Sequence, residues 1–159
     1  MRQFYFCKGI LPVDDLLKYL VCADFVIIVC LLLFISWQDI LLRIIANRNL
    51  LVLLCLLIPF IIMQQRFPNI LAAVVVLVVC FPLFIFKILG GGDVKLIAVL
   101  SMAFTWQQII DFIVVISLFG IVVAMTGLLF FRQITREQGV PYGVAISLGF
   151  IFLMPFYSC

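Results

Sequence analysis

Residues 89–96 read Leu-Gly-Gly-Gly-Asp-Val-Lys-Leu and lie between two long apolar runs. A glycine in a helix costs about 1 kcal/mol relative to alanine, and an ionisable group at helix-centre depth in a membrane costs roughly 2.5–3.5 kcal/mol. Irregular backbone near a membrane is tolerated where protein or a water-filled cavity surrounds it, so this stretch predicts a polar pocket that holds Asp93. The simpler interpretation is a connecting loop in which Asp93 caps a helix and Lys87 and Lys95 mark the cytoplasmic side.

The composition identifies an integral membrane protein. The chain has 159 residues, of which 68% are hydrophobic and 17 are Phe. Its mean hydropathy is +1.43. Soluble domains are about 45–50% apolar, well below this value. The net charge of +3 is scattered, so it reports membrane orientation and not a nucleic-acid surface. We expect one all-α, polytopic membrane domain over residues 1–159, with about six transmembrane helices.

The chain contains no histidine, which excludes Ser/His/Asp and Cys/His triads, HExxH zinc proteases and histidine-ligated haem. Its six cysteines show no CxxC spacing, and four of them lie in apolar runs, where cysteine behaves as a small hydrophobe. A cysteine zinc site is therefore not expected. A disulfide between Cys7 and Cys159 stays open, since the sequence does not supply its geometry.

The apolar runs predict six spans after an amphipathic lead-in at the interface over residues 1–18. Pro59 is expected to kink the second span. The fourth span is short and is allowed to extend through Trp106 toward Ile110, with Asp111 opening the next turn. The spans are expected at about 19–37, 49–63, 70–86, 96–105, 112–131 and 141–157.

The basic residues predict the orientation, because short cytoplasmic loops carry an excess of Lys and Arg. Arg66 falls on the opposite side, and the basic N-terminal tail argues mildly for the reverse orientation. The majority nonetheless places both termini outside. The cytoplasmic set is Arg43, Arg48, Lys87, Lys95, Arg132 and Arg136.

Two acids are expected at the same membrane boundary. Asp39 ends the first span and Asp93 precedes the fourth, so the chain returns to one face between them. Two carboxyl groups in a partly desolvated site share a proton at neutral pH, and such a pair activates water for attack on a peptide carbonyl. The alternative for Asp39 is a helical ion pair with Arg43, four residues later. For Asp24, near the outer end of the first span, a snorkelling or capped carboxylate is favoured.

Three segments together resemble one family. The run LGGGDVKLIAVLSMAF resembles the GxGD signature of the type IV prepilin peptidases, which are membrane aspartic peptidases. QDILLRIIANRNLL is similar to the family's first-aspartate segment, and VPYGVAISLG resembles its proline, tyrosine, glycine motif. The segments occur in family order, and together with the six predicted spans the resemblance covers nearly the whole chain.

The resemblance implies that Asp39 and Asp93 are the catalytic aspartates. Ala46 stands where the family usually has proline, and we expect alanine to keep that segment helical. The four-cysteine zinc-binding loop of the bifunctional members is absent, so N-methylation is not expected. Other motif positions, with supporting roles in shaping the site, are Gly90, Gly92, Arg43, Asn47, Lys95, Pro141, Tyr142 and Gly143.

The implied activity is removal of a short basic leader from prepilins or pseudopilins, as in type IV pilus assembly and protein secretion. The site would face the cytoplasm at the bacterial inner membrane, with the substrate and membrane lipid as partners and no nucleic acid. The resemblance implies neither a metal nor an organic cofactor. Lys95 would face away from Asp93 and contact lipid phosphate or substrate.

Three other functions stay open at this point. A small carrier or channel would use the paired aspartates to bind a cation or relay protons. A catalytically degenerate peptidase would be kept for pilus-assembly contacts. A serine and lysine peptidase would use Ser101 with Lys95.

Overall fold

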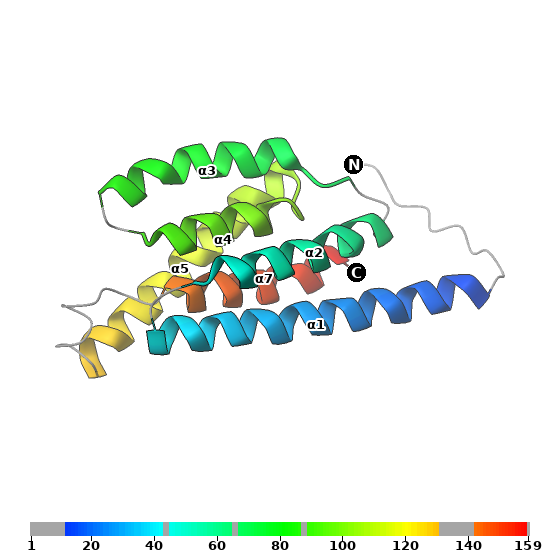
Figure 1. The fold of residues 1–159 in the computed structure, drawn as a ribbon, viewed down its shortest axis with the longest axis horizontal. Coiled ribbons are helices and arrows are strands. Elements are labelled where there is room, and N and C mark those ends of the chain that lie inside the picture. The colour runs from blue at the N-terminus through cyan, green and yellow to red at the C-terminus, as the bar shows by residue number, and fades with distance from the viewer. Residues whose placement is uncertain (1–11, 43–44, 65–66, 87–88, 131–141, 159) are drawn as a thin grey trace.

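The computed structural model describes residues 12–42, 45–64, 67–86, 89–130 and 142–158, and this part of the chain is helical, without strands (Figure 1). The all-α prediction is therefore confirmed. The helices are α1 (Pro12–Leu42), α2 (Asn47–Met63), α3 (Ile70–Ile85), α4 (Gly91–Ser101), α5 (Trp106–Phe130) and α7 (Tyr142–Ser158).

Four of the helices form the framework of the bundle. Helices α2 and α7 each pack against both α1 and α4, while α3 packs on the outer side of α4 and α5 packs on α7. In Figure 1, α3 and α1 lie at opposite edges, with α4 and α2 between them. Helices α2 and α7 therefore bridge α1 and α4.

Helix α4 is the central element. Seven of its 11 residues are buried, including Leu96 and Leu100, both fully buried. Its apolar side chains are spread around the helix, which is the pattern of a helix surrounded by protein. Lys95 is its exposed side chain. Because α4 packs against α2, α3 and α7, its polar residues Asp93 and Ser101 are removed from solvent.

Aromatic contacts join the segment after α4 to its neighbours. The ring of Phe104 lies 4.8 Å from that of Phe112 on α5 and 5.7 Å from that of Phe150 on α7, measured between centroids. The side-chain oxygen of Asn69 caps α3 by accepting from the Ala72 backbone amide. The backbone amide of Asn69 donates to the Met102 carbonyl at 3.0 Å. These contacts fix the end of α4 that lies away from Asp93.

Two helical segments, Tyr19–Leu42 and Trp106–Gly127, are long and apolar enough to cross a membrane, and three shorter apolar segments lie at Asn47–Met63, Ile70–Ile85 and Tyr142–Met154. Many large apolar side chains of the described helices are exposed, as a lipid-facing surface requires. The 11 residues of α4 rise only about 16 Å, which is less than the bilayer core. The number of crossings stays a prediction.

Several helix ends differ from the expected ones. Helix α1 already begins at Pro12, so residues 12–18 are continuous with the first predicted span. Residues 1–11 of the expected lead-in lie outside the described residues, and its place at the interface stays a prediction. It also continues past Asp39 to Leu42. The expected second and third spans agree with α2 and α3, and Pro59 lies inside α2.

The expected extension of the fourth span through Trp106 is wrong. Helix α4 ends at Ser101, and α5 begins at Trp106, which leaves Asp111 inside α5. The reason is a capping interaction, because the Thr105 amide donates to Gln108 Oε1 at 2.9 Å. A Thr followed three residues later by Gln is a helix-start signature that the span-based interpretation overlooked.

Candidate active site

Asp93 lies in the first turn of α4 and is buried, with 7% of its surface exposed. Its Oδ2 accepts a hydrogen bond from the Gly90 amide at 3.3 Å, and Gly90 is the residue that precedes the helix. A carboxylate in the first turn satisfies one of the amides that have no partner within the helix. The loop interpretation was therefore right that Asp93 caps a helix, but the helix begins among the glycines themselves.

Asp39 lies one turn before the end of α1 and is equally buried, at 6% exposed. Its Oδ2 accepts a hydrogen bond from the Gly143 amide at 2.9 Å, across 104 positions of sequence. Gly143 is the second residue of α7, so Asp39 accepts from one of that helix's free N-terminal amides. Each acid thus sits at a helix N-terminus, Asp93 at its own and Asp39 at that of α7.

The two carboxyl groups influence each other electrostatically. Asp93 precedes the fourth apolar run and lies outside the predicted spans. Burial, and secondarily the negative charge of Asp39, raise the pKa of Asp93 to about 7, against the lowering effect of the Gly90 amide. A carboxyl with this pKa is partly protonated at neutral pH, as one member of an acid and base pair must be.

Two glycines make room for these carboxylates. A Cβ on Gly143 would lie 2.8 Å from Asp39 Oδ2, and a Cβ on Gly90 would lie 2.9 Å from Asp93 Oδ2. A Cβ on Gly92 would instead meet the Ile45 Cβ at 2.8 Å. The glycines of the motifs are therefore needed for close approach.

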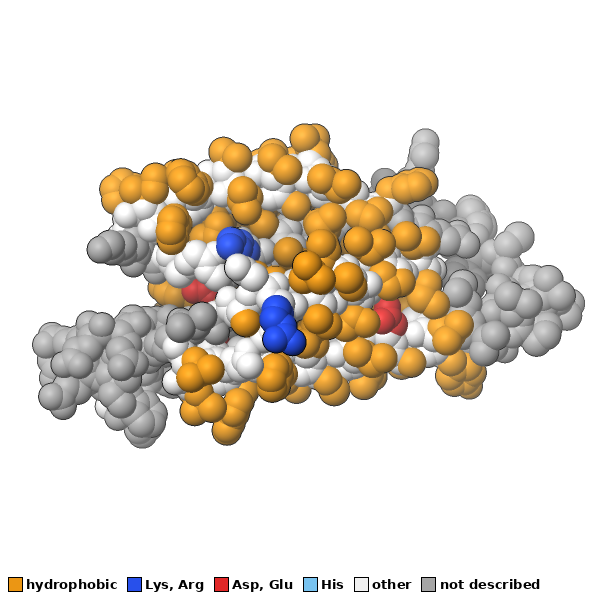
Figure 2. Space-filling view, in the orientation of Figure 1, with side chains coloured by type: hydrophobic (Ala, Val, Ile, Leu, Met, Phe, Trp, Pro, Cys, Tyr) orange, Lys and Arg blue, Asp and Glu red, His pale blue; other side chains and the backbone are white. Residues whose placement is uncertain are grey.

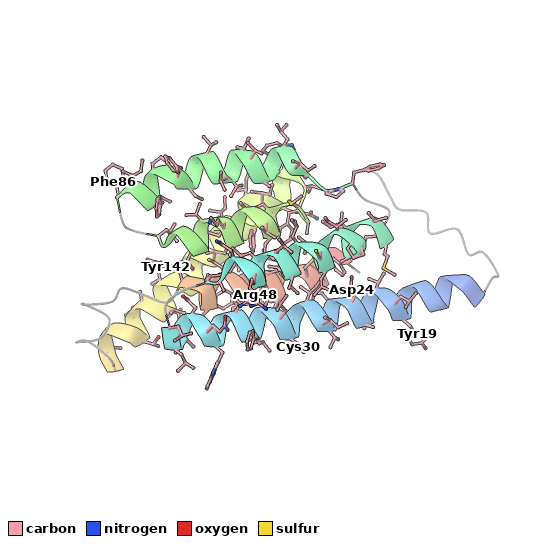
Figure 3. All side chains as sticks on the ribbon, in the orientation of Figure 1. Tyr19, Asp24, Cys30, Arg48, Phe86 and Tyr142 are labelled. Atoms are coloured by element: carbon pink, nitrogen blue, oxygen red, sulfur yellow. The ribbon has the colours of Figure 1, made fainter. Side chains whose placement is uncertain are left out.

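Polar side chains link α1, α2 and α4 at the end of the bundle that holds the acids. Lys95 Nζ donates to Asn47 Oδ1 at 3.2 Å, which ties the first turn of α2 to α4. Gln38, next to Asp39, accepts from Asn49 Nδ2 and joins α1 to α2. In Figure 2 the basic side chains lie apart on a mostly hydrophobic face, and Figure 3 labels Arg48 and Tyr142 toward the end where α2 and α7 begin.

The predicted site residues can now be placed. Asp39, Asn47, Gly90, Gly92, Asp93, Lys95, Tyr142 and Gly143 all lie at the end of the bundle where α1 ends and where α2, α4 and α7 begin. Lys95 is exposed and donates to Asn47 on α2, while its expected contact with lipid phosphate or substrate stays a prediction. Arg43 and Pro141 lie outside the described residues, as do Cys7 and Cys159 and therefore their disulfide.

The structure separates the residues of the serine and lysine alternative. Ser101 is fully buried at the far end of α4, where its hydroxyl donates to the Ile97 carbonyl at 2.7 Å, while Lys95 is exposed.

Asp24 lies about 22 Å from Asp39 along α1, by helical rise. Figure 3 shows it well away from Tyr142.

Sequence analysis did not single out Gln38, Asn49 or Ile45. The two polar residues lie within the first-aspartate segment, so a polar pair at the ends of two adjacent apolar runs was a usable signal. Ile45 carried no such signal, because its role is its contact with Gly92, distant in sequence.

The fold and the site define a class of protein, a helical membrane protein with two buried, interacting carboxyl groups. The model of the type IV leader peptidase family matches residues 26–125, more than half of the chain and including both acids. The chain therefore belongs to the type IV leader peptidase family and is a membrane-bound protease. No match was found among curated proteins or among solved structures.

Proposed function

We propose that this protein is a membrane aspartic endopeptidase that removes short basic leaders from prepilins or pseudopilins, with Asp39 and Asp93 as its catalytic residues. The observation that carries the proposal is the pairing of two buried carboxyl groups, one held by the Gly143 amide and the other by the Gly90 amide. The choice of leader rests on the family.

The chemistry follows from one ionised and one protonated carboxyl. The ionised group accepts a proton from water while the water oxygen bonds to the scissile carbonyl carbon, and the other group protonates the carbonyl oxygen. When the C–N bond breaks, the first group returns its proton to the leaving nitrogen, and the second recovers its own from the hydroxyl. Water is consumed and both carboxyl groups return to their starting forms.

The backbone beside Asp93 supports access by a peptide. Gly90 is exposed, and Gly91 and Gly92 are partly exposed, so a segment without side chains borders one of the acids. A substrate helix in lipid could place an unwound end against this segment. An exposed backbone next to an acid at a helix terminus suits a cut at the membrane boundary.

We further propose that this end faces the cytoplasm at the bacterial inner membrane. Arg48 and Lys95, near the starts of α2 and α4, belong to the majority set of basic residues. Positive residues favour the cytoplasmic side, so the site would meet leaders before they cross the membrane.

Co-expression with a candidate prepilin whose basic leader ends in glycine tests the function. Wild-type protein is expected to shorten the prepilin on gels, and Asp39→Asn and Asp93→Asn are each expected to leave it at full length. Each of these two variants is expected to cleave the prepilin about 10³-fold or more slowly than wild type, as for a member of a catalytic pair. Asp24→Asn, on the same helix as Asp39, is the matched control and is expected to cleave normally.

Normal cleavage by either variant of the pair would overturn the shared-proton mechanism. Failure of the wild type on several such prepilins, with the protein inserted and folded, would instead favour the degenerate peptidase or the carrier. Proton flux in vesicles, lost in Asp39→Asn, would then identify the carrier.

A further inference from the structure

The surroundings of the two acids differ in a way that bears on their roles. Asp39 Oδ2 receives a buried hydrogen bond of 2.9 Å from an amide at the start of another helix, α7. An N-terminal amide and the positive end of a helix dipole both favour a negative charge. The ionised form of Asp39 is therefore stabilised by a donor that the chain brings from elsewhere.

Asp93 has a poorer set of donors. Its Oδ2 receives the longer bond, 3.3 Å, from Gly90, and its Oδ1 is buried without a hydrogen-bond partner in the described part of the chain. A buried charged oxygen that lacks a donor is disfavoured, whereas a protonated carboxyl carries no charge to desolvate. Of the two acids, Asp93 is the one whose neutral form the surroundings favour.

We propose that the backbone amide of Gly143 is a positioning group that keeps Asp39 ionised as the general base, so that Asp93 is the general acid. This inference rests on the proposed function. Asp39 then takes the proton from water as the new C–O bond forms, and Asp93 gives its proton to the carbonyl oxygen. Asp39 returns its proton to the leaving nitrogen when the C–N bond breaks.

Other charged or titratable groups lie on the packed helices at the same end of the bundle. Arg48 on α2 is exposed, Tyr142 on α7 is partly buried, and Lys95 on α4 is hydrogen-bonded to Asn47. The Gly143 amide differs from them because it bonds directly to an oxygen of Asp39. It is also the contact that one added methyl group would displace.

Gly143→Ala tests the assignment, because the new Cβ would lie 2.8 Å from Asp39 Oδ2 and 3.1 Å from its Cγ. The carboxylate must move away from its donor. We expect kcat to fall about 10-fold to 100-fold with a smaller change in KM, and the acidic limb of the kcat/KM profile to move up by about one pH unit. The acidic limb moves because it reports the free enzyme's base.

Gly149→Ala is the matched control on the same helix. Its Cβ would lie 3.1 Å from Ile116 Cγ1, a packing contact away from the acids. This variant is expected to lose stability while both limbs of its pH profile stay in place. A structural effect on α7 alone would therefore not reproduce the shift.

An infrared measurement keeps the proposal testable if Gly143→Ala does not fold. At about pH 6, the band of a buried protonated carboxyl is expected to persist in Asp39→Asn and to be lost in Asp93→Asn. The reverse pattern, or a Gly143→Ala profile whose acidic limb does not move, overturns the assignment. If either contrary result is found in an enzyme that cleaves prepilin and needs both acids, only the assignment of base and acid has failed. If cleavage does not need both acids, the proposed function itself has failed.

Discussion

At the residue scale, Asp93 is an acid whose carboxyl group is buried in the protein. Its pKa is raised from an ordinary 3.8 to about 7, first by burial and then by the charge of Asp39. A raised carboxyl pKa destabilises the folded state at high pH, because the unfolded chain releases its proton at lower pH than the folded one does. The penalty is absent below about pH 4, grows between about pH 4 and pH 7, and is constant above.

Asp93→Asn should therefore stabilise the fold at neutral and high pH. Asparagine keeps an oxygen that can accept from the Gly90 amide but carries no charge. Above about pH 7 the gain should approach about 4 kcal/mol, and it should vanish near pH 4. Thermal unfolding in detergent at both pH values measures it.

Asp111→Asn, at an exposed position of α5, supplies the comparison for the same chemical change outside the site. An Asp93→Asn variant that is equally or less stable than wild type above pH 7 would contradict the large pKa shift. Activity and stability are thus expected to oppose each other at this residue.

At the scale of elements, the start of α2 decides how the first-aspartate segment reaches α4. Ala46 precedes α2 with φ −67° and ψ 133°, so it is extended, and the expectation that alanine keeps this segment helical is wrong. Its carbonyl accepts from the amides of Asn49 and Leu50. The turn therefore has the backbone geometry that proline would also adopt.

Ala46→Pro should raise stability by about 0.4–1 kcal/mol and preserve activity, because proline restricts the unfolded chain and fits this φ. Thermal unfolding and prepilin cleavage measure the two effects. Leu51→Pro, at an exposed position inside α2, is the contrasting variant and should lose about 3 kcal/mol. Loss of cleavage in a stable Ala46→Pro variant would show that proline had moved its neighbour Ile45, which contacts Gly92.

At the scale of the whole molecule, the site is assembled at one end of the bundle. The amides of α4 and α7 meet the two carboxylates there, and the Lys95 contact joins α2 to α4. The short connection between α2 and α3, which contains Phe67 at 94% exposure, lies after the other end of α2. The orientation of the bundle therefore decides which compartment the site faces.

Single cysteines at Arg48 and Phe67, in a background without the native cysteines, test this orientation. Intact cells should react with an impermeant thiol reagent at Phe67→Cys, whereas Arg48→Cys should react only after permeabilisation. Both positions are exposed, which makes them a matched pair. The opposite labelling pattern would place the acids on the outer face and rule out a cytoplasmic leader peptidase.

The sequence by itself determined the helical class, the bounds of α2 and α3 to within about two residues, and the placement of Asp39 and Asp93 at one end of the bundle. These features depend on local hydropathy, on caps and on short motifs. The start of α5 was also predictable from the Thr105 and Gln108 cap, although hydropathy alone indicated a later start.

Only the tertiary structure decided what surrounds each acid. Asp39 ends the first apolar run on the side where α7 begins, but its position in that run does not reveal that its carboxylate meets the Gly143 amide. The bond from Gly143 to Asp39 spans 104 positions, and the contact between Gly92 and Ile45 joins two helix starts. Local pattern does not encode such contacts, because they depend on how α2 and α7 pack against both α1 and α4.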